Sequence, residues 1–355
     1  MEKDKILGLR KRIDQIDKKI LQLLNERFEI ALKLRRLKEQ ITVPEREKEI
    51  LQNAQRYPSY LMDKEFIEKI MTLIIERSKY IQAQEFKLIG FQGEHGAFSE
   101  IAALKFSDKS IPVPCKEFED VFEETEKGML DFGIVPIENS LEGGISRVYE
   151  LLLSRDLYIV GEVNLPIHHC LLSLPDEDYR DLKVVYSHPQ ALNQCKDFIV
   201  RHKLEARPYY DTAGAAKMLS EKRMKGVCVI ASKLCASMYG LDIIKENVED
   251  HPDNVTRFLV LSKSKCEKGD KCSMIFGTKH EPGALLKVLK IFADCGINLT
   301  KIESKPKRGD PGSYLFYIDF HGSEDDKNTL LALDRIKKEA EFVKFLGFYP
   351  SDKRD

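Results

Sequence analysis

The sequence lacks a charge excess, a long apolar run and paired cysteine motifs, and each absence excludes a class of protein. Its 355 residues carry 57 Lys and Arg against 58 Asp and Glu, which leaves no basic surface typical of nucleic-acid or membrane binding. No apolar run approaches the length of a membrane span, and the N-terminus is charged rather than signal-like. The eight cysteines include no C-x-x-C pair, which favours reduced thiols and a cytoplasmic location.

Two motifs that bind cofactors or metals are also missing. The glycines beside the first predicted strand, at 87–91, are Gly90, Gly93 and Gly96, which lack the G-x-G-x-x-G spacing of a dinucleotide site. The His-His-Cys segment at 168–170 lies in a strand-like run, where adjacent side chains face opposite sides, so we expect a structural role. The sequence therefore predicts no cofactor and no metal.

The chain is long for one hydrophobic core, and its pattern changes twice, which predicts several domains. Residues 1–85 carry helical periodicity, and residues 86–262 alternate predicted strands with helices. After a charged linker, residues 271–355 follow a strand–helix–strand–strand–helix–strand order. We therefore expect a multidomain protein with an all-α helical domain, a two-lobed α/β domain and an α+β ferredoxin-like domain.

The first domain begins with an unbroken apolar pattern that predicts one helix from Asp4 to about Thr42. Such a helix spans roughly 55–60 Å, whereas a globule of about 85 residues is only about 30 Å across. A second chain should therefore lie along it. Arg27 and Lys38 would share one face of this helix, while Arg10 would point about 100° away from Arg27.

Two shorter helices are predicted at 44–56 and 63–84, and Ser78 and Gln82 are i, i+4 neighbours on the second. The first domain resembles the all-helical chorismate mutases in its motifs Leu9-Arg10-x-x-Ile13-Asp14, Glu26-Arg27, Lys38, Pro44-Glu45-Arg46-Glu47 and Ile75-Glu76-Arg77-Ser78-x-x-x-Gln82. The resemblance implies a dimer whose site takes these residues from one chain: Arg27, Lys38, Arg46, Glu47, Ser78 and Gln82. Arg10 would come from the other chain.

The implied reaction, chorismate to prephenate, is an intramolecular rearrangement that needs a folded substrate and a stabilised ether oxygen. Three arginines can clamp the two carboxylates: Arg10, Arg27 and Arg46. Lys38 and Gln82 can donate to the ether oxygen, and Glu47 can accept from the ring hydroxyl.

Four stretches of the middle domain place polar residues at the ends of predicted strands, where open α/β sheets bind ligands. They lie at 136–140, 187–192, 211–213 and 253–258. The second and third precede predicted helices, whose N-termini offer free N–H groups to an anion. A single such motif is better explained as helix capping, but several together favour a carboxylate site.

Together these stretches resemble the prephenate dehydratase family, which implies a periplasmic-binding-protein-like fold and conversion of prephenate to phenylpyruvate with loss of CO2 and water. Thr256 would donate a hydrogen bond to the leaving hydroxyl. The residues implied to position the substrate are Asn139, Ser140, Ser187, Gln190, Thr212 and Arg257. Asp211 stands where the family usually has serine, and we expect it to point away from the dianionic substrate.

The last domain resembles the ACT domain of phenylalanine-regulated dehydratases through Glu281-Pro282-Gly283-Ala284-Leu285 and the segment 298–306. The resemblance implies L-phenylalanine as effector, bound across a dimer interface by Gly283, Ala284, Leu285, Asn298, Glu303 and Ser304. Lys305 replaces the usual arginine. A purely structural dimerisation domain is the alternative.

Over its full length the chain resembles bifunctional chorismate mutase/prephenate dehydratases. This implies a feedback-inhibited enzyme of phenylalanine biosynthesis, a homodimer or a higher homo-oligomer. The alternative from another class is a non-catalytic amino-acid sensor with a vestigial mutase. A DNA-binding helix-turn-helix or a basic patch would favour that alternative, and the sequence contains neither.

Overall fold

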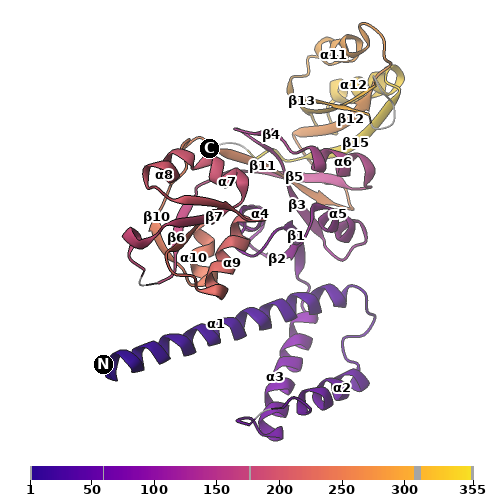
Figure 1. Ribbon diagram of the computed structural model, residues 1–355. Coiled ribbons are helices and arrows are strands. Elements are labelled where there is room, and N and C mark those ends of the chain that lie inside the picture. The colour runs from indigo at the N-terminus through magenta and orange to yellow at the C-terminus, as the bar shows by residue number, and fades with distance from the viewer. Residues whose placement is uncertain (1, 59, 176, 308–312, 353–355) are drawn as a thin grey trace. The chain divides into compact units, whose positions relative to one another are not determined.

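The computed structural model describes residues 2–58, 60–175, 177–307 and 313–352, and the chain divides into two units between Phe86 and Lys87. The described part of the first unit is all helical, and the second contains the β-sheets (Figure 1). Across the described residues, none of the helices is both long and apolar enough to cross a membrane.

The first unit contains α1 (Glu2–Arg35), α2 (Pro44–Gln55) and α3 (Lys64–Gln82). Proline at the first position of α2 and the Asp63 side chain, which accepts from the backbone N–H of Phe66, begin the two shorter helices. Both shorter helices were predicted nearly to the residue.

The predicted extension of α1 to about Thr42 is wrong, because the helix ends at Arg35. Its end tightens into i→i+3 bonds, such as Arg36 N–H to the Lys33 carbonyl at 3.1 Å. The β-branched run at 41–43 precedes a proline, and both features disfavour helical backbone.

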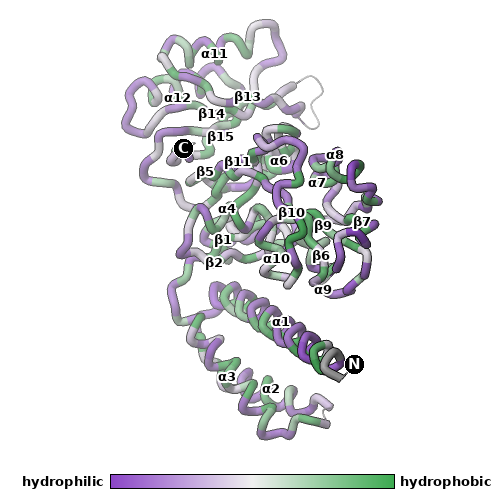
Figure 2. The backbone as a smooth tube through the Cα atoms, turned by 90° about the vertical axis from the view of Figure 1, so that its left-hand side faces the viewer, coloured by the Kyte–Doolittle hydropathy of each residue, from purple (hydrophilic) through white to green (hydrophobic). Residues whose placement is uncertain are grey.

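The N-terminal part of α1 extends beyond α2 and α3 within this unit (Figure 1). Apolar side chains recur along it at alternating spacings of four and three, and they remain exposed: Leu9, Ile13, Ile16, Ile20 and Leu23. Figure 2 shows apolar and polar positions alternating along the helix. This regular apolar stripe is the pattern of a helix that packs against another helix.

The first lobe of the second unit is built on the sheet order β2-β1-β3-β11-β5, with β4 paired to β3. Its strands are β1 (Lys87–Gln92), β2 (Ser110–Cys115), β3 (Phe132–Asn139), β4 (Gly143–Gly144), β5 (Tyr158–Pro166) and β11 (Val255–Ser262). Its helices are α4 (Phe98–Phe106), α5 (Phe118–Glu126) and α6 (Ser146–Ser154). The strand β2 was not predicted, because Pro112 and Pro114 are tolerated only at a sheet edge.

The second lobe carries the sheet order β10-β6-β9-β7-β8. Its strands are β6 (Cys170–Ser173), β7 (Val184–Ser187), β8 (Glu205–Pro208), β9 (Val227–Ala231) and β10 (Asp242–Lys245). Its helical segments are a 3-10 turn (Tyr179–Asp181), α7 (Pro189–Gln194), α8 (Lys196–Arg201), α9 (Thr212–Lys222) and α10 (Lys233–Tyr239). The single helix predicted over 190–203 is therefore two short ones, separated at Cys195.

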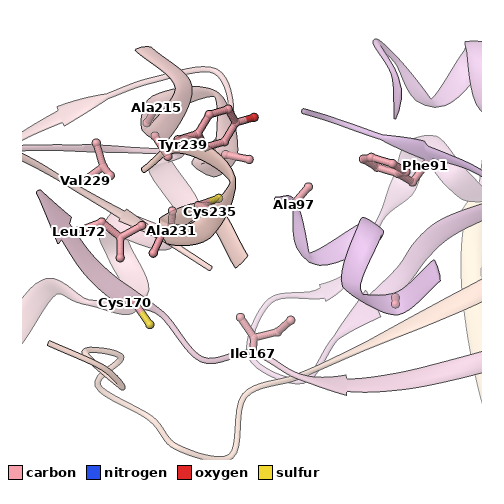
Figure 3. Packing of buried hydrophobic residues seen from close by; sticks show 14 of the residues in the cluster. Phe91, Ala97, Ile167, Cys170, Leu172, Ala215, Val229, Ala231, Cys235 and Tyr239 are labelled. Atoms are coloured by element: carbon pink, nitrogen blue, oxygen red, sulfur yellow. The ribbon is translucent and has the colours of Figure 1, made fainter. Parts of the chain in front are cut away.

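The chain crosses between these lobes twice, after β5 and again before β11. One buried cluster includes Phe91 and Ala97 from the first lobe and Leu172 and Val229 from the second (Figure 3). This two-lobed architecture with a double crossover is that of periplasmic binding proteins, as predicted.

The last domain has the sheet order β13-β14-β12-β15, with β12 (Lys271–Gly277), β13 (Leu299–Pro306), β14 (Tyr314–His321) and β15 (Phe342–Tyr349). Its helices are α11 (Ala284–Asp294) and α12 (Lys327–Glu339), in the predicted ferredoxin-like order. The sheet packs on β5, where Gly347 has a φ of +133° and a Cβ would lie 2.6 Å from the Ile159 carbonyl oxygen. Only glycine fits this close approach.

Candidate active sites

The helical unit holds a buried cationic nitrogen without an internal partner. The Nη1 atom of Arg27 is buried and forms no hydrogen bond within the described part of the chain. Burial lowers the pKa of this guanidinium from its ordinary value. A buried unpaired donor is costly, so an anionic ligand bound here would be stabilised.

Several other predicted residues of this unit lie close together on α2 and α3. Gln82 Nε2 donates to Ser78 Oγ at 3.2 Å, and both Glu47 oxygens accept from Lys79 Nζ at 3.2 and 3.0 Å. Lys79 was not predicted, although its position directly after Ser78 placed it on the same helical turn. By contrast, Arg46 is exposed and pairs with a neighbouring glutamate on its own helix.

Helix α1 does not place two of the predicted residues, Lys38 and Arg10, beside Arg27. Lys38 follows the end of α1, so the angular argument that placed it on the face of Arg27 does not apply. Its carbonyl instead accepts from Arg35 Nη1 at 2.7 Å. Arg10 lies on the same helix as Arg27, but seventeen residues of helix separate them by about 25 Å.

In the dehydratase-like unit, Thr256 and Asn139 face each other across β11 and β3. Asn139 Nδ2 donates to Thr256 Oγ1 at 2.9 Å, while its Oδ1 accepts from the backbone N–H groups of Leu141 and Glu142. Because the amide oxygen is already engaged, the NH2 group must face Thr256. The threonine hydroxyl therefore accepts from Asn139 and keeps its own hydrogen for another acceptor.

A chain of amides continues from this pair toward the second lobe. Asn139 Nδ2 also donates to Asn254 Oδ1 at 2.7 Å, and Asn254 Nδ2 donates to Gln194 Oε1 at 3.1 Å. Gln194 lies at the end of α7 in the second lobe, so the chain spans the crossover. Gln194 was not predicted. Asn254 belongs to the polar stretch 253–258 identified in the sequence, but it was not among the residues expected to position the substrate.

His169 completes this network as a neutral side chain. Its Nε2 lies 2.9 Å from Gln194 Oε1, an acceptor, so Nε2 carries the hydrogen. Its Nδ1 is buried and unpaired within the described residues. Desolvation lowers the pKa of His169, because protonation would place an unpartnered N–H in the interior. The expectation that His169 lies within a strand is wrong, because β5 ends at Pro166 and β6 begins at Cys170.

Four further predicted residues differ in how they are placed. Ser140 Oγ donates to the Asp253 carbonyl at 3.2 Å and holds the turn before β11. Ser187 is fully buried and donates to the Ile230 carbonyl at 2.5 Å, so it is not free to contact a ligand. Gln190 and Thr212 are partly buried at the starts of α7 and α9.

Asp211 caps α9 and occupies its first N–H groups. Its Oδ1 accepts from the Ala213 N–H at 2.7 Å and from the Gly214 N–H at 3.4 Å. Burial raises the pKa of Asp211, and those backbone hydrogen bonds oppose the rise. The expectation that this helix offers free N–H groups to a substrate anion is therefore wrong for these two groups.

Arg257 lies on the face of β11 opposite to Thr256, because adjacent residues of a strand point to opposite sides. Its guanidinium is buried against Glu162 and Asp319, at 2.7 and 2.5 Å. Asp319 belongs to β14 of the last domain. The prediction that Arg257 positions the substrate is therefore not supported, since its donors are engaged on the other side of the sheet.

The last domain contains a pocket of about 610 Å³ at the start of α11. Gly283, Ala284 and Leu285 line it, together with Tyr314 and Phe316 of β14. The helix α11 begins at this pocket without a side-chain cap, and its first N–H, that of Ala284, donates to the Glu281 carbonyl at 3.2 Å. A helix N-terminus beside apolar side chains suits a small ligand with a carboxylate and an apolar group.

The predicted effector residues of β13 lie at different ends of that strand. Ser304 pairs with Phe316, which lines the pocket, and Glu303 is its neighbour on the strand. Asn298 lies before the other end, where its carbonyl accepts from the His321 N–H. At about 3.3 Å per residue it stands roughly 20 Å from Ser304. One chain therefore does not bring Asn298 to this pocket.

The family models that match the chain follow the same order as the domains. A chorismate mutase type II model matches residues 9–83, a prephenate dehydratase model matches 89–266, and an ACT domain model matches 273–338. A bifunctional chorismate mutase/prephenate dehydratase from Aquifex aeolicus is 36% identical over 98% of this chain and 98% of its own length.

Two other similar proteins match about three quarters of the chain. An arogenate dehydratase/prephenate dehydratase from Arabidopsis thaliana is 43% identical, covering 74% of this chain and 72% of its own length. The solved structure of a prephenate dehydratase in complex with L-Phe from Arthrobacter aurescens has 31% identity and a TM-score of 0.69, and it covers 74% of this chain and 89% of that one.

Proposed function

The chain belongs to the family of bifunctional chorismate mutase/prephenate dehydratases, and we propose from this premise how its residues divide the two reactions. It is an enzyme that rearranges chorismate to prephenate and converts prephenate to phenylpyruvate with loss of CO2 and water. We assign the mutase to residues 1–85, the dehydratase to 86–262 and regulation to 271–355.

In the mutase, Arg27 binds a carboxylate of chorismate, which is supported by its buried unpaired Nη1. Gln82 donates to the ether oxygen from its place beside Ser78, and Glu47 accepts from the ring hydroxyl. Lys38 reaches the same substrate from the segment that follows α1, Arg46 reaches it from α2, and Arg10 is supplied by a second chain. Fixed donors around a folded dianion lower the barrier without any proton transfer.

In the dehydratase, Thr256 donates a hydrogen bond to the departing ring hydroxyl. The observation that carries this assignment is the bond from Asn139 Nδ2, which leaves the threonine hydrogen free. Ser140 holds the turn beside them, and Gln190 and Thr212 contact the substrate from the second lobe. The placement of Arg257 on the other face fits the chemistry, because a cation on the ring carboxylate would stabilise the ground state and slow loss of CO2.

L-phenylalanine is the proposed effector, bound at Gly283, Ala284 and Leu285 beside Ser304 and Glu303. Support comes from the pocket at the start of α11 and from a similar dehydratase solved with L-Phe. Asn298 would reach this pocket from a partner chain, because within one chain Asn298 and Ser304, which pairs with the pocket residue Phe316, lie at opposite ends of β13.

A homodimer or higher homo-oligomer is supported by the exposed apolar stripe of α1 and by the distance between Arg10 and Arg27. A cytoplasmic location is supported by the eight free cysteines. To test the function, purified protein is given chorismate without any added cofactor, and products are separated over time. Prephenate should appear first and phenylpyruvate second; formation of neither would contradict the assignment.

A further inference from the structure

Two neighbouring residue pairs of β3 and β11 serve opposite faces of one sheet. Thr256 pairs with Asn139, and Arg257 pairs with Glu138 in the next register position. Arg257 Nη1 lies 3.2 Å from a Glu138 oxygen. Because the backbone joins the two pairs directly, a shift of the Arg257 pair moves the Thr256 pair as well.

The guanidinium of Arg257 is held on each of its nitrogens. Its Nε bonds to Glu162 at 2.7 Å, its Nη1 to Asp319 at 2.5 Å, and its Nη2 to the Tyr349 hydroxyl at 3.1 Å. A planar group with partners on several sides has one orientation. The strand that carries Thr256 is therefore fixed from behind by its own neighbour.

Among the described residues, the buried cluster around Arg257 balances three cations against three carboxylates. The cations are Arg257, Lys271 and Lys301, and the carboxylates are Glu138, Glu162 and Asp319. Ser273 donates to Asp319, accepts from the Tyr317 hydroxyl and bonds to the Tyr349 hydroxyl. Removing one partner from such a cluster leaves a buried charge, so its geometry is strongly preferred.

Much of this cluster belongs to the regulatory domain rather than to the dehydratase lobes. Asp319 and Tyr349 come from β14 and β15, and Lys301 comes from β13 and bonds to Glu138. The strands β3 and β11 of the dehydratase therefore form hydrogen bonds and ion pairs with side chains of the regulatory domain.

We propose that Arg257 is a positioning residue of the dehydratase reaction and that Asp319 and Tyr349 complete it by holding its guanidinium. Arg257 acts through the Thr256–Asn139 pair on the other face of the sheet. The proposal therefore rests on the proposed role of Thr256. A misplacement of about 1 Å in a reacting group can cost roughly 10²-fold in rate. The regulatory domain is accordingly part of the machinery that sets the dehydratase rate even without an effector.

The first test is Asp319→Asn, which keeps the shape of the side chain and removes its charge. Without phenylalanine, kcat for prephenate should fall by roughly 10- to 100-fold while KM changes little, since substrate binding groups are untouched. Because the mutase lies in another unit, a thermal unfolding transition of the second unit at the wild-type temperature reports that the variant is folded. An intact variant with unchanged kcat overturns the proposal.

A matched control breaks a different contact between the same domains. Lys344 of β15 donates to the carbonyls of Leu153 and Arg155 at the end of α6, away from Arg257. Lys344→Met should keep kcat close to the wild-type value. An equal loss in this variant would show that general loosening of the interface is responsible, and would overturn the proposal.

The second test separates positioning from support of the fold. Tyr349→Phe removes one bond to Arg257 without altering charge and should lower kcat by a smaller factor. If it acts through Thr256, it should have no further effect in a Thr256→Val background, because the group being positioned is gone. If the double variant instead loses kcat by the product of the two single losses, the proposal is refuted. This comparison of single and double variants is also the deciding test if Asp319→Asn does not fold. Wild-type activity of Thr256→Val alone would instead refute the proposed function.

Discussion

The hydroxyl of Thr256 is the group on which the dehydratase assignment depends. Thr256→Val keeps the shape of the side chain and removes the donor, so kcat for prephenate should fall by about 10²–10³-fold, as for loss of one oriented donor. Thr256→Ser should retain much of the rate, because the hydroxyl still meets Asn139. Steady-state kinetics with prephenate measure this, and chorismate turnover by the same variants should stay near normal because the mutase lies in another unit.

His169 gives the structure a dependence on pH with a definite sign. Its pKa in the fold is lowered, chiefly by burial, so below the ordinary pKa of about 6.5 the unfolded chain binds a proton that the folded chain does not. The free energy of unfolding should therefore decrease as pH falls below about 6.5, toward the lowered pKa of the folded state. His169→Gln should lose less stability over that range than the wild type in calorimetric unfolding, and equal losses would contradict the lowered pKa.

The motifs led to Asn139 beside Thr256, but they did not identify Gln194 and did not show which way Arg257 points. Arg257 follows Thr256 directly in the sequence, and the alternation of a strand already places it on the other face. Its partner Asp319 lies in a different domain, and no local pattern identifies such a contact. The predicted position of Lys38 was wrong for a similar reason, because the end of α1 depends on weak effects of β-branched residues and a proline.

At the scale of single elements, α1 requires a second chain to complete the mutase site, because it carries Arg10 and Arg27 about 25 Å apart. Arg10→Ala and Arg27→Ala should each abolish mutase activity as pure proteins. A mixed dimer of the two should regain about half of the wild-type rate, because one of its two sites receives both arginines. Purified heterodimers carrying different tags provide the measurement.

A neighbouring residue on the same helix supplies the control for that experiment. Arg12 is exposed, and it lies about 200° around the helix from Arg10. Arg12→Ala should leave mutase activity unchanged both alone and in mixed dimers. Inactive heterodimers of verified composition would rule out a site shared between chains.

The predicted order of elements was most accurate where periodicity was regular. The last domain was predicted strand by strand, because β14 alternates apolar residues such as Phe316 and Ile318. The expectation that this strand is half-buried is wrong, since Tyr317 and Asp319 on its other face are buried as well. The edge strand β2 and the break between α7 and α8 were missed. Neither proline at a sheet edge nor a kink at Cys195 leaves a periodic signal, and tertiary packing decides both.

Across the whole molecule, control requires that phenylalanine at α11 change the affinity or rate at a distant cleft. The sheet that carries the pocket also carries Asp319 and Lys301, which bond to the dehydratase strands. A ligand can shift this arrangement only by binding one state better than another. A coupling of about 1–3 kcal/mol would alter affinity by roughly 5- to 150-fold.

Gly283 tests where the effector acts. It has a φ of +85° with open space around it, so Gly283→Val strains the backbone at the pocket without a side-chain clash. Gly296, at the other end of α11, has a φ of +68° and equally open surroundings, and Gly296→Val imposes the same kind of strain away from the pocket. Dehydratase rates measured against phenylalanine concentration should show weakened inhibition in the first variant and near wild-type inhibition in the second. Equal inhibition of both variants and the wild type would place the effector elsewhere, because a strained Gly283 turn cannot leave binding at that turn unchanged.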